Sequence, residues 1–98
     1  MLTCYKCEEL NKNIKIKLPN DLKFLIRLAK QKQSENVLSV AEDSNDIWVG
    51  KPSDFDEITE NGWSDIVLFE FKCNFCGQRF KLSCETYHGA GGEWKPIS

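Results

Sequence analysis

The stretch IVLFEFKCNFCG, residues 66–77, decides the fold. Its first seven residues are rich in β-branched and aromatic side chains, which predicts a strand. The strand leads directly into a Cys-x-x-Cys turn, and residues 79–86 are expected to return as its hairpin partner. Cysteines two residues apart can hold one metal ion from a tight turn. Gly77 tolerates the left-handed backbone that lets amides point at the sulfur atoms. The stretch therefore predicts a β-hairpin with a metal-binding turn at its tip.

A second Cys-x-x-Cys pair lies near the amino terminus, at Cys4 and Cys7. Two such turns complete a tetrahedron of thiolates, so we expect one structural Zn²⁺ held by Cys4, Cys7, Cys73 and Cys76. Iron also accepts four thiolates, and the residues do not distinguish the two metals. The alternatives are four unrelated thiols, or a thioredoxin-like redox pair, which would require a pair that follows a strand and opens a helix.

These residues resemble the zinc ribbon proteins, in which two cysteine knuckles on hairpins meet around zinc. The resemblance covers the four cysteines and Gly77, about a dozen residues of the chain. It departs from the family at Glu8, where a glycine is usual, and in the 65 residues that separate Cys7 from Cys73. The resemblance implies a ribbon closed across an inserted body of helix and sheet.

The first half of that body is predicted from hydrophobic spacing. Residues 13–18 alternate apolar and polar, which predicts a half-buried strand with Ile14, Ile16 and Leu18 on one face. After Pro19, a helix is expected to run from Asn20 or Asp21 to about residue 33. Its buried stripe is predicted to be Leu22, Leu25, Ile26 and Ala29, and its basic face Lys23, Arg27 and Lys30.

The second half predicts further short strands. Residues 37–40 and 47–49 are expected to be strands, with a short helical turn near residues 54–58. The glycine-rich tail from residue 88 is expected to be a flexible turn, with Trp94 docked on the core. A recognition loop that uses Tyr87, His88 and Trp94 is the alternative. The sequence as a whole predicts an α+β fold, with one main helix and a small antiparallel sheet.

Length and composition point to one metal-stabilised domain over residues 1–98. Residues 1–4 do not start a charged and apolar leader, which favours a cytoplasmic setting. In such a reducing compartment, five cysteines favour metal binding over disulfides. No apolar run approaches the roughly 20 residues that a membrane span needs. The fifth cysteine, Cys84, shares a predicted strand face with apolar residues and is expected to be a core thiol. Its alternative is a nucleophile paired with His88, for which no orienting residue is evident.

Charge is distributed unevenly along the chain. Residues 1–33 carry eight basic and three acidic side chains, whereas residues 42–65 carry eight acidic and one basic. Acidic residues steer the approach of a basic protein, and aromatic residues supply most of the affinity. We therefore predict a protein-binding surface formed by Trp48, Asp54, Asp56, Glu57, Glu60 and Trp63, with Phe55 as a further exposed aromatic candidate.

Small size, acidity and the lack of an evident catalytic set resemble the bacterial immunity proteins, which neutralise toxins by direct binding. The resemblance implies a non-catalytic immunity protein or antitoxin with a basic toxin domain as its partner. The second hypothesis is a nucleic-acid-binding zinc ribbon, in which Lys23, Arg27 and Lys30, with Lys15 and Lys17, contact phosphates. An isoelectric point near 5.4 weighs against it. An enzyme is only the third hypothesis. A closed four-thiolate site leaves no open position at which the metal could activate a water molecule.

Overall fold

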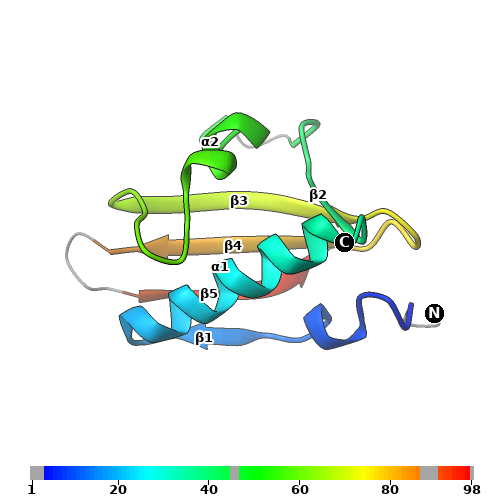
Figure 1. Ribbon diagram of the computed structural model, residues 1–98, viewed down its shortest axis with the longest axis horizontal. Coiled ribbons are helices and arrows are strands. Elements are labelled where there is room, and N and C mark those ends of the chain that lie inside the picture. The colour runs from blue at the N-terminus through cyan, green and yellow to red at the C-terminus, as the bar shows by residue number, and fades with distance from the viewer. Residues whose placement is uncertain (1–3, 45–46, 87–90, 98) are drawn as a thin grey trace.

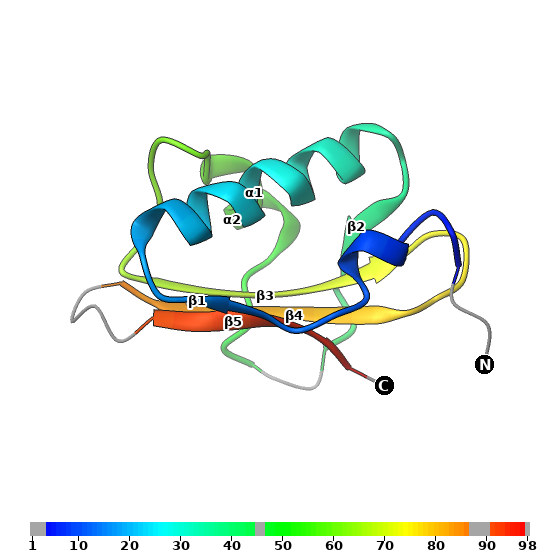
Figure 2. The same cartoon turned by 90° about the horizontal axis from the view of Figure 1, so that it is seen from below.

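The computed structural model describes residues 4–44, 47–86 and 91–97. Five antiparallel strands form one sheet in the order β1-β5-β4-β3-β2, and helix α1 crosses one face of it (Figures 1 and 2). This arrangement confirms the predicted α+β fold with one main helix. The elements are η1 (Glu8–Leu10), β1 (Ile14–Ile16), α1 (Pro19–Ser34), β2 (Leu38–Val40), α2 (Pro52–Glu57), β3 (Ile66–Cys73), β4 (Arg79–Glu85) and β5 (Gly91–Ile97).

Helix α1 begins at Pro19, whose fixed φ suits the first helical position. The Asp21 carboxylate accepts hydrogen bonds from the backbone N–H groups of Lys17 and Leu18, both at 2.9 Å. These bonds hold the chain at the start of the helix, and they turn Leu18 outward, where it is 64% exposed. The prediction that Leu18 shares the buried face of the first strand is therefore wrong. The predicted buried stripe of the helix is confirmed: Leu22, Leu25, Ile26 and Ala29 are all buried.

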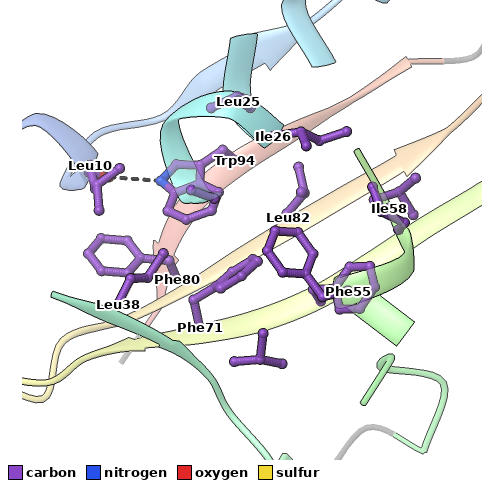
Figure 3. Packing of buried hydrophobic residues seen from close by; sticks show 14 of the residues in the cluster. Leu10, Leu25, Ile26, Leu38, Phe55, Ile58, Phe71, Phe80, Leu82 and Trp94 are labelled. Carbon is purple, nitrogen blue, oxygen red and sulfur yellow. Dashed lines mark hydrogen bonds between the residues drawn. The ribbon is translucent and has the colours of Figure 1, made fainter. Parts of the chain in front are cut away.

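The core lies between α1 and the sheet and is centred on aromatic rings (Figure 3). Trp94 of β5 is fully buried and stacks on Phe80, with ring centroids 5.3 Å apart. Its indole N–H donates to the backbone carbonyl of Leu10 at 2.8 Å, so the polar atom of this large side chain is satisfied. The expectation that Trp94 docks on the core is confirmed.

Phe55 of α2 forms a second aromatic contact with the sheet. Its ring meets Phe69 and Phe71 edge-on, with both pairs of centroids 5.1 Å apart. Phe55 is fully buried, so its predicted place on an exposed surface is wrong. The buried ring instead attaches the short helix α2 to the sheet. Other side chains of α2, such as Asp54 and Glu57, are exposed.

Two predictions for loops and strands are corrected. Residues 47–49 form a turn and not a strand, and Ile47 and Trp48 are exposed there. Part of the glycine-rich tail forms strand β5, which pairs with β4 along its whole length. Glycine is required at position 92 because a Cβ there would overlap the Ser83 carbonyl oxygen of β4. Tyr87 and His88 lie outside the described residues.

Candidate functional site

The four cysteines predicted to bind metal lie together at one end of the sheet. Cys4 and Cys7 occupy the turn before η1, while Cys73 ends β3 and Cys76 lies in the β3–β4 turn. Their four Sγ atoms all lie within 4.8 Å of one another. The Sγ atoms of Cys7 and Cys76 are 3.6 Å apart. Zn–S bonds of about 2.3 Å in a tetrahedron place sulfur atoms roughly 3.8 Å apart, so this donor set fits one tetrahedral ion.

The first cysteine turn is closed by its own backbone. The N–H of Cys7 donates to the carbonyl of Cys4 at 3.1 Å, and the N–H of Leu10 donates to the carbonyl of Cys7 at 2.9 Å. The second bond starts the 3-10 helix η1, whose Leu10 carbonyl accepts the Trp94 bond described above. The first turn is thus followed by a helical turn and not by a hairpin, which differs from the zinc ribbon pattern.

The second cysteine turn joins β3 to β4, as predicted. The N–H of Gly77 donates to the Cys73 carbonyl at 3.0 Å, and Gly77 has a φ of 80°. This left-handed conformation is the one that glycine adopts without steric cost. The N–H of Phe75 points back and donates to Cys73 Sγ at 3.4 Å. Backbone donors of this kind stabilise a thiolate sulfur in the geometry that a metal site requires.

Asn74 fixes this turn to β2 and to the two residues before it. Its backbone N–H donates to the Val37 carbonyl at 2.8 Å, and its side-chain amide donates to the Asn36 carbonyl at 3.0 Å. The Ser39 hydroxyl donates to Asn74 Oδ1 at 2.9 Å. The turn is therefore held in place by neighbouring chain as well as by any bound ion.

Burial and hydrogen bonding affect the cysteine thiols unequally. Cys7 is fully buried, and burial raises its pKa, as do the hydrogen bonds that its S–H donates to the sulfurs of Cys76 and Cys73. Burial also acts to raise the pKa of Cys73, but the backbone N–H groups of Cys76 and Phe75 lower it below its usual value. Four sulfurs this close cannot all ionise without a cation between them, because like charges repel. A divalent metal that accepts thiolate ligands would supply that charge.

Cys84 is separate from this cluster. It lies in β4, is 4% exposed and belongs to the apolar core. Burial raises the pKa of its thiol, which keeps the sulfur protonated. The prediction of a core thiol is confirmed.

Four of the six residues predicted to bind a partner line one surface groove. Trp48, Asp54, Glu57 and Trp63 surround a groove of about 460 Å³ beside α2 and the first half of β3. Trp48 is 79% exposed, while Trp63 is half-buried against the core. The Asp54 carboxylate also accepts the backbone N–H of Lys51 at 2.8 Å, which fixes its position at the start of α2.

The two remaining predicted acids face helix α1. The Arg27 guanidinium donates two hydrogen bonds to the Glu60 carboxylate, at 2.8 and 3.2 Å. Lys30 Nζ donates to the Phe55 carbonyl at 2.6 Å and lies 4.2 Å from the centroid of the Phe55 ring. Asp56 attracts the same Lys30 side chain. The acidic and basic segments therefore partly neutralise each other within the chain.

Sequence reasoning missed the apolar wall of the groove. Ile66 and Leu68 line it from β3, and Ile66 is 67% exposed. The alternation of the strand could have indicated them. Val67, Phe69 and Phe71 face the core, so the alternate residues Ile66 and Leu68 must face away from it.

Comparison of the chain with protein-family models, curated proteins and solved structures finds no match. Within the described residues, no helix has both the length and the apolar content that a bilayer span requires. Any functional assignment therefore depends on the two features described above, namely the cysteine cluster and the groove.

Proposed function

We propose that this protein is a non-catalytic protein-binding module, that one Zn²⁺ held by the four clustered cysteines stabilises it, and that the groove beside α2 binds a basic protein. In its more specific form, the proposal is an immunity protein or antitoxin that neutralises a basic toxin domain by direct contact. The observation that carries the proposal is the meeting of two tryptophans and two carboxylates in one groove, although they come from three separate segments.

The groove has the composition expected of a binding site. Tryptophan is enriched among the residues that dominate protein interfaces, and Trp48 is highly exposed. Ile66 is also exposed in this hollow, and exposed large apolar residues that share one hollow indicate a contact surface more strongly than scattered ones do. Asp54 and Glu57 give the same hollow a negative charge, which speeds the approach of a basic partner.

The donor set supports a structural role for the metal. Four thiolates fill the coordination sphere of Zn²⁺, so a site of this type leaves no position for an activated water. Cys84 gives no support to thiol chemistry either, because its sulfur is buried and its pKa is raised. Both observations favour a binding role over a catalytic one.

Nucleic-acid binding is the second candidate function. The surface that best fits it lies on the sheet and not on the predicted face of the helix. Arg27 and Lys30 of the predicted helix surface are occupied by Glu60 and the Phe55 region. A different hollow of about 450 Å³, on the sheet, is lined by Lys15, Lys17, Lys81 and Lys95. Glu93 contacts Lys15 and Lys95 there, which reduces the charge available for phosphates. A gel-retardation assay with RNA and DNA at low salt tests this candidate, which fails if the parent protein retards neither.

The main test is capture of a partner followed by reconstitution from two purified proteins. We expect the double variant Asp54→Asn, Glu57→Gln to associate more slowly and with a weaker dependence on salt. The matched control, Glu8→Gln with Glu42→Gln, removes the same charge from exposed positions outside the groove lining. Equal effects of the two double variants, or no effect of either, would contradict the proposed surface.

The identity of the metal is tested on the reduced protein. Native mass spectrometry should show one ion per chain, and elemental analysis should identify it as zinc. A folded, reduced protein that purifies without metal would contradict the zinc part of the proposal.

Neutralisation of a toxin is tested separately, by co-expressing the captured partner with the parent protein or with the groove variant and measuring cell growth.

A further inference from the structure

From the lining of the groove we infer that it binds an arginine side chain of the partner, an inference that rests on the proposed protein-binding function. Only two charged side chains line the groove within the described residues, Asp54 and Glu57, and both are acidic. The charge of the groove is thus complementary to a cation. The remaining lining is largely aromatic and aliphatic, which suits a cation that carries an apolar stem.

The lining of the hollow is suited to a long basic side chain. Figure 1 shows α2 above the edge of β3, and the groove lies between these elements and the turn that carries Trp48. Ile66 and Leu68 provide an aliphatic wall from β3. Long basic side chains pack their methylene stems along such surfaces while the charged end stays near water. The carboxylates of α2 are available to that charged end.

The two tryptophans favour arginine over lysine. Guanidinium is planar and weakly hydrated, so it stacks on indole faces and also forms paired hydrogen bonds with carboxylates. Ammonium is a compact, strongly hydrated charge that gains less from two flat rings. Trp48, Trp63 and Glu57 all line the hollow, so its lining carries the two kinds of group that a guanidinium contacts.

The loop that carries Trp48 is held close to β3, so the groove is formed before a partner arrives. The Gly50 N–H donates to the Leu68 carbonyl at 2.8 Å. A Cβ at Gly50 would come within 2.5 Å of Phe69 Cε1, so only glycine permits this approach without movement of the ring. A pre-formed site loses less conformational entropy on binding.

The test uses short peptides as probes and the indole N–H signals of the protein in ¹⁵N-labelled form. The probe is acetyl-Gly-Ser-Arg-Ser-Gly-amide, and its matched controls carry citrulline or lysine in place of arginine. Citrulline has nearly the same shape as arginine but no charge. The chain has three tryptophans. Trp94 is an internal control, because it is fully buried and its indole N–H is bonded to Leu10.

We expect the arginine peptide to shift the Trp48 and Trp63 indole signals while the Trp94 signal stays in place. The citrulline peptide should bind about tenfold more weakly, as expected for loss of a cation–π contact and a charge-assisted hydrogen bond. Glu57→Gln should weaken binding of the arginine peptide about three- to tenfold. Glu42→Gln, which lies outside the groove lining, should leave it unchanged.

Three results would overturn the inference: equal binding of arginine and citrulline peptides, binding of lysine as tight as that of arginine, or no shift of Trp48 and Trp63 at millimolar peptide. Failure here is distinguishable from failure of the proposed function. If a reconstituted partner depends on Asp54 and Glu57 while the arginine peptide does not bind, protein binding stands and the arginine assignment alone fails. If the partner is indifferent to both acids, the proposed surface itself fails.

Discussion

At one end of β3, Cys73 lies in a cluster of four sulfurs, whereas at the other end Ile66 borders a hollow backed by packed aromatic rings. At the cysteine end, short turns hold the chain segments and place four sulfur atoms where one ion could join them. The groove end is held by Phe55, whose ring meets Phe69 and Phe71 edge-on. Two regions of one strand thus depend on different forces. Conditions that weaken metal binding should therefore affect one of them before the other.

The largest expected effect comes from removal of the metal. Chelation under reducing conditions, or Cys73→Ser, should cost several kcal/mol of folding free energy, since structural zinc contributes on the order of 10 kcal/mol. Hydrogen exchange measured by mass spectrometry should rise first at residues 4–10 and 73–77, while α2 stays protected. Cys84→Ala is the control, because it removes a thiol outside the cluster and should leave metal content unchanged. Equal loss of protection in both regions would contradict the view that the two ends of β3 are stabilised separately.

Phe55→Ala should give the next largest effect and the opposite pattern. Removing a fully buried phenylalanine costs about 3–5 kcal/mol of unfolding free energy, because it leaves a cavity beside two other rings. Urea unfolding measures the loss, and hydrogen exchange should now rise first in α2 and around Trp48. Metal content should remain at one ion per chain. A loss below about 1 kcal/mol would show that α2 is held by contacts other than this ring.

The smallest effect concerns the exposed pair of Arg27 and Glu60. Hydrogen bonds from Arg27 hold the pKa of Glu60 below its usual range. A carboxylate with a lowered pKa in the folded state stabilises the protein above its unfolded pKa, and the contribution disappears as pH falls through the folded pKa. The parent protein should therefore be slightly more stable than Glu60→Gln at pH 7, and the difference should shrink below about pH 4.3.

Urea midpoints of the two proteins, compared at each pH, measure this difference. The comparison would cancel the loss of a bound metal in acid, which both proteins would share. A difference that grows toward acid pH would show that the pair contributes through something other than its charge.

The sequence predicts the helix and the cysteine cluster well, for a common physical reason. The stripe of α1 repeats at helical spacing, and each cysteine pair lies in one short turn, so both patterns are local. The meeting of the two pairs is long-range, and it was predicted because a tetrahedral ion needs four ligands. Strand β5 was not predicted, because Gly91, Gly92 and Pro96 are typical of loops. Pro96 is tolerated there because β1 pairs only with Gly92–Trp94, which leaves the end of β5 at the sheet edge.

The surface residues were harder to assign because their neighbours are distant in sequence. Phe55 is apolar within an acidic segment, and only the packing of α2 on β3 decides that its ring points inward. Ile47 and Trp48 have high strand propensity, yet the approach of Gly50 to Phe69 leaves them in an exposed turn. Glu60 looked like part of an open acidic rim until the fold placed it against Arg27, 33 positions away in the chain.

The position of β5 in the sheet has a consequence for how the chain folds. This strand lies between β1 and β4, so Ile14 pairs with Trp94. During synthesis, β1 has no neighbour in the sheet until residues 91–97 have left the ribosome. Contacts that join such distant residues slow folding, because a long loop must close before they form. The nascent chain is therefore expected to complete its sheet only after nearly all of these 98 residues have been made.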